Sequence, residues 1–229
     1  MLVFDFLRTL VQESFIHSST GPELLERVLE AVPPYVGRDH HVLFQSKLLS
    51  DLMDYLAASL TVDKLVASPN LAAAAEAFYS LLVAKVYRKS FPGGSRLVFD
   101  FLVTLITKLG VSAAPASAAL VAPLTSALSL IVIHDVYCAA NGVGREPPLD
   151  VLNRLLLYQQ TVFLPTNTSS EFYGCLCYWL YRFLLHDDSH LRLSAMNLWK
   201  LLILTRREHV GPFLASSPEA DVYTGGFER

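Results

Sequence analysis

Apolar residues recur along most of the chain at the three- and four-residue spacing of amphipathic helices. Prolines, glycines and helix-capping residues interrupt this pattern at intervals, and no stretch alternates apolar and polar residues as a half-buried strand does. The pattern therefore predicts an all-α protein. Its helices are expected over residues 2–17, 22–32, 38–60, 70–89, 95–109, 116–140, 148–163, 169–185 and 189–208.

One apolar segment occurs twice, as LVFDFLRTL at residues 2–10 and as LVFDFLVTL at residues 97–105, with a single difference in nine positions. The second copy predicts a helix that other helices cover on most sides, because its apolar residues fill far more than a narrow stripe. These residues are Val98, Phe99, Phe101, Leu102, Val103, Leu105 and Ile106. The remaining polar strip consists of Asp100, Thr104, Thr107 and Lys108, matched by Asp5, Arg8, Thr9, Gln12 and Glu13 in the first copy.

Several residues predict where helices begin and end. Pro22 suits the first turn of a helix, where a missing amide proton costs nothing. Asn70 and Ser95 are expected as N-caps, and Gly110 is expected to end a helix. The intervening loops are short, which favours antiparallel packing of successive helices.

The two copies of the repeated segment begin 95 residues apart, about two units of a helical repeat of roughly 40–47 residues. A second repeat signature is LLHDDSHLRLSAMNLWKLLI at residues 184–203, which resembles the second helix of a HEAT-type repeat. Asp187 or Asp188 would cap this helix, and its inner face would consist of Leu191, Ala195, Leu198 and Leu202. We expect an armadillo/HEAT-like α-solenoid of antiparallel helices over residues 1–214, with a compact irregular helical bundle as the alternative. Residues 215–229 are expected to form a loop or linker.

Composition narrows the class of protein. Of the 229 residues, 52% are hydrophobic and 17% are charged, so the chain is on the apolar side of globular proteins. A net charge of −3 provides no broad positive field for a phosphate backbone, and nucleic acid is not expected as a partner. The three cysteines, Cys138, Cys175 and Cys177, form no disulfide framework, which fits a reducing, intracellular setting. Cys175 and Cys177 lie in an apolar helical run and are expected to be buried free thiols. The first residues lack the basic region and cleavage site of a signal peptide.

The sequence leaves two other classes of protein open. An integral membrane protein would use residues 109–133 as a span, with 172–185 as a second segment, although Pro115 and Pro123 interrupt the first. A helical enzyme would use His134 as a base and Asp135 as its orienting acid, but no serine or cysteine lies in a recognised nucleophile motif.

Other clusters have simpler structural readings. His186 and His190 flank two aspartates as a metal site might, yet a helix cap explains the acids and no further ligands have metal-site spacing. Gly93-Gly94-Ser95 precedes a helix but lacks the lysine of a phosphate-binding loop. We therefore predict no catalytic, cofactor-binding or metal-binding residue, no cofactor, and a protein that is not an enzyme.

Three stretches together resemble one family: FPGGSRLVFDFLVTLI at 91–106, LDVLNRLLLYQQTVFLPTNTSSEFYGCLCYWLYRFLL at 149–185 and LWKLLILTRREHVGPFLASSPEADVYTGGFER at 198–229. They are similar to the helical region that precedes the PH and BEACH domains of giant BEACH scaffold proteins, especially the Alfy-like members that also carry WD repeats and a FYVE domain.

The resemblance implies a non-catalytic helical scaffold and protein-interaction segment, with a role in membrane traffic or selective autophagy. Its expected partners are other proteins and the PH-BEACH-WD40 region of its own chain. The expected location is cytoplasmic, with peripheral association with endomembranes through domains outside residues 1–229.

Overall fold

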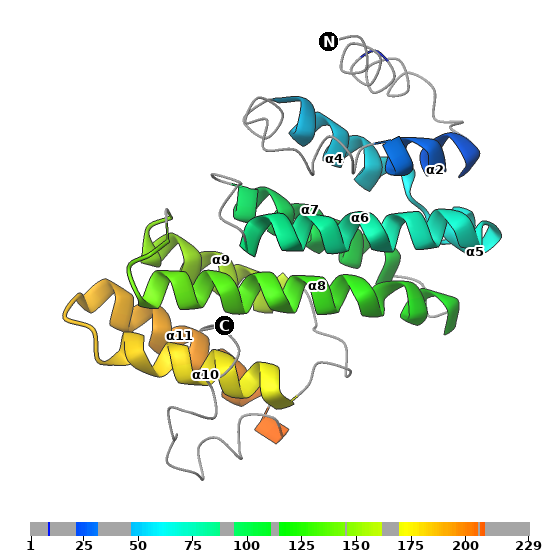
Figure 1. Cartoon of the computed structure of the whole chain (residues 1–229). Coiled ribbons are helices and arrows are strands. Elements are labelled where there is room, and N and C mark those ends of the chain that lie inside the picture. The colour runs from blue at the N-terminus through cyan, green and yellow to red at the C-terminus, as the bar shows by residue number, and fades with distance from the viewer. Residues whose placement is uncertain are drawn as a thin grey trace. The chain divides into compact units, whose positions relative to one another are not determined.

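The computed structural model describes residue 9 and residues 22–31, 47–87, 94–110, 115–144, 146–161, 170–205 and 207–208. Within these ranges the regular structure is helical and no strand occurs, so the all-α prediction is confirmed. The helices are α2 (Pro22–Ala31), α4 (Lys47–Ser59), α5 (Val62–Ala67), α6 (Pro69–Tyr87), α7 (Gly94–Gly110), α8 (Pro115–Ala140), α9 (Pro148–Thr161), α10 (Ser170–Leu184) and α11 (Ser189–Thr205) (Figure 1). The helix expected over 2–17, the caps and breaks at 33–46 and 88–93, and the linker at 215–229 lie outside the described residues.

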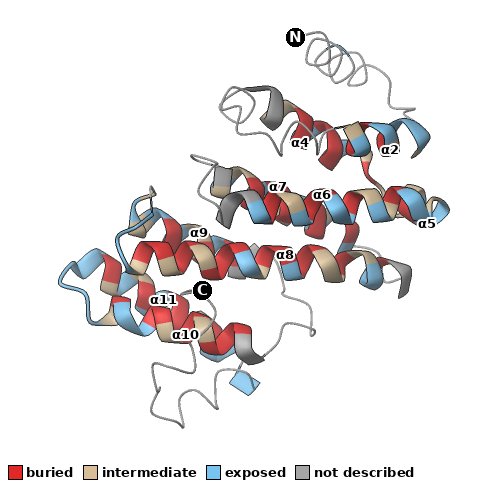
Figure 2. Ribbon diagram, viewed as in Figure 1, coloured by how far each residue is buried: buried red, intermediate tan, exposed pale blue. Residues whose placement is uncertain are grey.

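The chain divides into two compact units, Met1–Leu128 and Ser129–Arg229, and helix α8 runs through the division. In the first unit α6 packs against α2, α5 and α7, and α7 also packs against α4. In the second unit α11 packs against both α9 and α10. Along α6, Figure 2 shows buried residues interspersed with exposed ones, as expected of an amphipathic helix.

Helix α7 contains the second copy of the repeated segment, and its burial follows the prediction. Val98, Leu102 and Leu105 have no exposed surface, and Phe99, Phe101 and Ile106 are also buried. Asp100, Thr104 and Thr107 are exposed, and Lys108 is half-buried. The helix ends at Gly110 as expected, and it begins at Gly94, one residue before the predicted cap Ser95. One polar edge on a buried helix is therefore confirmed.

The region between α4 and α6 corrects two predictions. Residues 62–67 form the short helix α5, capped by Thr61, where the apolar pattern predicted a connecting loop. The cap of α6 is Ser68, whose Oγ accepts a hydrogen bond from the amide of Leu71 at 3.3 Å. Asn70 already lies within the helix, because Pro69 takes the first helical position and Ser68 precedes it.

Helix α11 confirms the cap and the inner face expected of it. The Asp188 carboxylate accepts a hydrogen bond from the amide of His190 at 2.8 Å, at the start of the helix. The predicted inner face is buried, together with Trp199; it consists of Leu191, Ala195, Leu198 and Leu202. The acids between His186 and His190 are thus explained as a helix start, and the described residues hold no group of three or more potential metal ligands.

The apolar stretch expected as a membrane span does not form one helix over 109–133, because Leu109 and Gly110 belong to α7. Among the described residues, the helix that is long and apolar enough to cross a bilayer is the 24-residue part of α8 from Ser117 to Ala140. Half of its most apolar window is buried within the protein. Burial of this kind is also found in the core helices of soluble proteins, so length and composition alone do not decide between the two.

Candidate functional site

The described residues contain two features with functional potential, one in each unit. The first is a groove between α4 and α7, and the second is a cluster of ionisable side chains at the carboxyl end of α8. Neither was predicted as a site, although the groove is lined by the polar strip of the repeated segment and the cluster contains His134 and Asp135.

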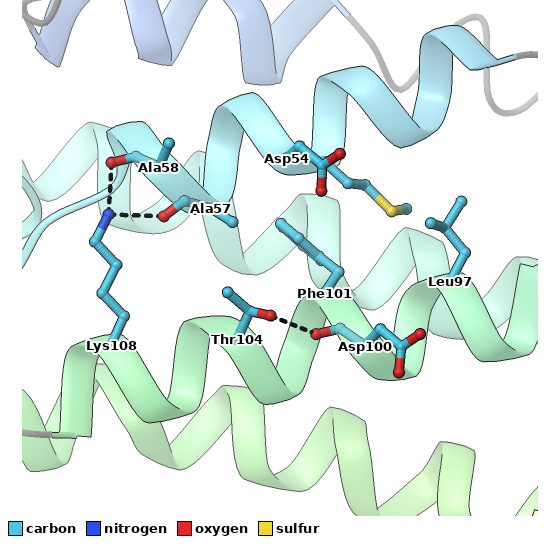
Figure 3. A pocket seen from close by; sticks show the side chains of 9 residues that line it. Asp54, Ala57, Ala58, Leu97, Asp100, Phe101, Thr104 and Lys108 are labelled. Carbon is cyan, nitrogen blue, oxygen red and sulfur yellow. Dashed lines mark hydrogen bonds between the residues drawn. The ribbon is translucent and has the colours of Figure 1, made fainter. Parts of the chain in front are cut away.

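The groove encloses about 450 Å³ and is lined by residues of α4 and α7 only: Met53, Asp54, Ala57, Ala58, Leu97, Asp100, Phe101, Thr104 and Lys108 (Figure 3). Its floor is apolar, because Met53, Ala57 and Phe101 are buried. The small side chains of Ala57 and Ala58 leave room where larger residues would fill the space between the helices. The volume lies within the usual range for pockets that bind ligands, about 300–1,000 Å³.

The polar groups of the groove are separated along its length. Asp54 and Asp100 lie toward one end, and Lys108 lies at the other (Figure 3). The Lys108 amine donates hydrogen bonds to the carbonyl oxygens of Ala57 at 2.7 Å and Ala58 at 2.5 Å, at the carboxyl end of α4. Burial lowers the pKa of Lys108, and the charge of Lys64 lowers it further. Lys108 therefore serves as a C-terminal cap for α4, where the helix dipole favours a cation.

The two acids at the other end of the groove are exposed to solvent. Asp54 is exposed. The Asp100 side chain is 59% exposed, and its carboxylate lies 3.8 Å from Arg96, which is itself 72% exposed. Such an exposed pair is weak and is screened by salt. The groove can thus offer an apolar floor beside two carboxylates.

The cluster in the second unit is built around Arg154 of α9. Its guanidinium donates to the Asp135 carboxylate at 2.7 Å and to the Glu146 carboxylate at 2.6 Å. The side chains of Arg154 and Asp135 are only 11% and 8% exposed, and that of Glu146 is 25% exposed. The fork of the guanidinium suits two carboxylates at once, so this network joins α8, the turn after it and α9.

His134 and Cys138 extend the cluster along α8. The Nδ1 atom of His134 lies 3.5 Å from the Asp135 carboxylate, and its Nε2 atom lies 3.6 Å from the sulfur of Cys138. Burial opposes the imidazolium charge, but the hydrogen bonds with Asp135 and Cys138 outweigh it and raise the pKa of His134 to about 9. The hypothesised base and orienting acid are therefore together, and Cys138 supplies a thiol that sequence reasoning missed. Its signal was the four-residue spacing from His134, which places both side chains on one helix face.

The other cysteines differ in environment. Cys138, Cys175 and Cys177 form no disulfide, Cys177 is fully buried and Cys175 is half-buried. Burial raises the pKa of Cys177 to about 12, so it stays a protonated thiol at neutral pH. The prediction of buried free thiols is confirmed for Cys177, whereas Cys175 is a free thiol that is only half-buried.

The protein SPIRRIG of Arabidopsis thaliana is 25% identical to this chain over 288 aligned positions, and the BEACH domain-containing protein A2 of the same plant is 25% identical over 289. Each match covers 99% of this chain. The chain resembles part of a BEACH-domain protein.

The matched segment is a small part of each relative, since the chain spans about 8% of their length. The aligned stretch also exceeds the 229 residues of the chain, so the plant proteins carry insertions relative to it. No protein-family model matches the chain. No solved structure matches it either.

Proposed function

We propose that the chain is a non-catalytic helical scaffold segment of a BEACH-type protein, which binds other proteins during membrane traffic or selective autophagy. The observation that carries this proposal is the match of 99% of the chain to 8% of a BEACH domain-containing protein. A small helical segment within a very long chain is suited to spacing domains and presenting surfaces. The Alfy-like subgroup, a cytoplasmic location and peripheral association with endomembranes are part of the same proposal.

The proposed architecture is an armadillo/HEAT-like α-solenoid, and α11 supports it. This helix is buried on one face, but Leu193, Met196 and Leu204 on the opposite face are 57%, 58% and 71% exposed. Helices of a solenoid pack against neighbours on both sides, because each repeat buries its apolar surface on the next. A compact bundle gives no reason for apolar residues at helical spacing on an outer face.

Substitution on this face distinguishes the two architectures. Leu193→Glu with Met196→Glu should leave the unfolding of the isolated 229-residue chain unchanged, since both side chains already meet solvent. In the full-length protein the same pair should increase limited proteolysis around α11. Equal proteolysis of wild-type and variant full-length proteins would favour the compact bundle.

The groove between α4 and α7 is the surface we expect a partner protein to occupy. Its apolar floor and the Asp54 and Asp100 carboxylates complement a segment with a large apolar side chain next to a lysine or arginine. Lys108 is engaged with the carbonyls of α4, so the acidic end is the part that distinguishes partners. The occupant is thus a basic-apolar segment of another protein.

The test uses the tagged full-length protein, natively purified from cells and compared by quantitative mass spectrometry with variants. Asp54→Lys with Asp100→Lys should remove a defined set of partners that an added basic-apolar peptide also displaces. Asp63→Lys with Glu76→Lys makes the same charge change at exposed residues outside the groove and should retain that set. Identical partner sets for both double variants would refute the groove as the binding surface.

A membrane-spanning protein is the second candidate function, favoured by the length and composition of α8. Alkaline carbonate extraction of membranes separates the two, because peripheral scaffolds are released and spanning helices are retained. The scaffold proposal predicts release of the full-length protein. Its retention in the membrane pellet, abolished by Ile131→Lys with Val132→Lys in α8, would establish the alternative.

A further inference from the structure

Cys138 lies in an arrangement that the scaffold function does not use. Its sulfur contacts Nε2 of His134 at 3.6 Å, and the other imidazole nitrogen lies 3.5 Å from Asp135. A thiol in contact with an imidazole that has a carboxylate close to it is an arrangement that favours a nucleophilic cysteine. The Asp135 carboxylate is in turn fixed by Arg154, which also holds Glu146. The arrangement spans α8, its following turn and α9, all within the second unit.

We propose that Cys138 is a site of oxidation by small peroxides, with His134 as the group that stabilises its thiolate and donates a proton to the departing oxygen. The inference concerns the molecule's redox chemistry and stands apart from the proposed scaffold function. A small oxidant fits because Cys138 is only 8% exposed. The raised pKa of His134, about 9, keeps its imidazole protonated at neutral pH.

The reaction is a two-electron oxidation. The Cys138 thiolate attacks one oxygen of the peroxide, the O–O bond breaks, and a sulfur–oxygen bond forms. The departing hydroxide takes the proton from Nε2 of His134 and leaves as water. The sulfur ends as a sulfenic acid and the imidazole as its neutral form, so the ion pair between them is lost. Arg154, Asp135 and Glu146 are paired with one another, and the sulfur of Cys138 makes a polar contact with His134.

The turn after α8 would respond to this modification. The amides of Val143 and Gly144 donate to the Cys138 carbonyl at 3.0 and 3.2 Å, and Gly142 takes a positive φ of 65°. A Cβ at Gly144 would meet the Cβ of Cys138 at 3.3 Å, so the turn packs closely over this residue. Oxygen on the sulfur, together with neutral His134, should therefore loosen the turn and the adjacent Arg154–Glu146 pair.

In the experiment, the full-length protein is exposed to hydrogen peroxide at pH 7 in the presence of dimedone, a reagent that traps sulfenic acids. Peptide mass spectrometry then measures the rate of dimedone labelling at each cysteine. Cys177 is the internal reference for a buried, protonated thiol. Cys175, which is half-buried, is the reference for a thiol that the peroxide reaches more easily. Labelling of Cys138 should be at least tenfold faster than that of Cys177. His134→Gln should slow Cys138 about tenfold and leave Cys175 unchanged.

A measurement on the wild-type protein keeps the proposal testable if His134→Gln disturbs folding. The ratio of the Cys138 and Cys177 labelling rates is taken on the unsubstituted protein, and Cys138 should be at least tenfold faster. Cys138 labelled no faster than Cys177 would overturn the proposal. Unchanged labelling in a folded His134→Gln protein would also overturn it.

Discussion

Loss of Arg154 provides the most demanding test of the second unit. Arg154→Met removes the cation that neutralises the Asp135 carboxylate, which is 8% exposed and lies 2.7 Å from the guanidinium. Breaking a buried ion pair by removing one partner costs about 3–5 kcal/mol, because a charge remains buried without compensation. The protonated His134 lies 3.5 Å from the same carboxylate and retains part of that compensation. We therefore expect a loss near the lower end, about 3 kcal/mol.

The assay is urea unfolding at pH 7, followed by tryptophan fluorescence. The chain has two tryptophans, and both Trp179 and Trp199 are buried in the second unit, so the signal reports on the unit that contains the cluster. Lys200→Met removes an exposed cation from the same unit and should change the unfolding free energy by less than about 0.5 kcal/mol.

A second variant identifies the cause of the loss. Asp135→Leu with Arg154→Met replaces both charges and should recover much of the stability, since a buried ion pair and an apolar pair are often equivalent. A fall of under about 1 kcal/mol for Arg154→Met alone would refute the buried-charge argument. So would a double variant that is destabilised by the sum of the single changes.

Three further predictions follow. The pKa of His134 is raised from 6.5 to about 9, so the stability that its protonation contributes is complete below pH 6.5 and is lost as the pH rises through 9. The unfolding free energy of the second unit should therefore fall over this pH window by at most about 3 kcal/mol. The variant His134→Gln should make the unfolding free energy nearly independent of pH over the same window. Lys108→Met should destabilise the first unit by about 1 kcal/mol, because α4 loses its C-terminal cap; urea unfolding followed by far-ultraviolet circular dichroism measures the change. Arg96→Met removes one partner of an exposed ion pair and should have no measurable effect. Gly142→Ala should cost about 1–2 kcal/mol in the tryptophan-monitored unfolding because of the positive φ, while Gly110→Ala, at a helix end with open space, should be tolerated.

Helical periodicity predicted the long helices well, because each buries one continuous face whose spacing is visible in the sequence. Helix α5 was missed since six residues are less than two turns and display no periodicity. The cap of α6 was predicted at the wrong residue because Ser68 and Asn70 are both good N-caps. Pro69 between them favours Ser68, since proline suits the first position of a helix and the cap precedes it.

The site residues were harder to predict than the helices. The groove depends on Ala57 and Ala58 facing α7, a contact between residues about 50 positions apart. The ion pair between Asp135 and Arg154 also joins two helices, α8 and α9. The sequence does not show which residues of two packed helices lie opposite one another, so this pair could not be predicted. The contact between Cys138 and His134 could have been predicted, because residues four apart lie on the same face of a helix. Cys138 lies in no recognised nucleophile motif, so the motifs gave no sign of it.

The central claim, that this chain is a scaffold segment of a BEACH-type protein, is tested most directly on the natural gene product. An antibody against residues 47–205 would isolate the endogenous protein, and a denaturing gel with peptide mass spectrometry would give its size and composition. The account predicts one polypeptide far larger than 25.4 kDa that yields BEACH-domain peptides together with peptides of this segment. A species of 25.4 kDa without BEACH-domain peptides would contradict it.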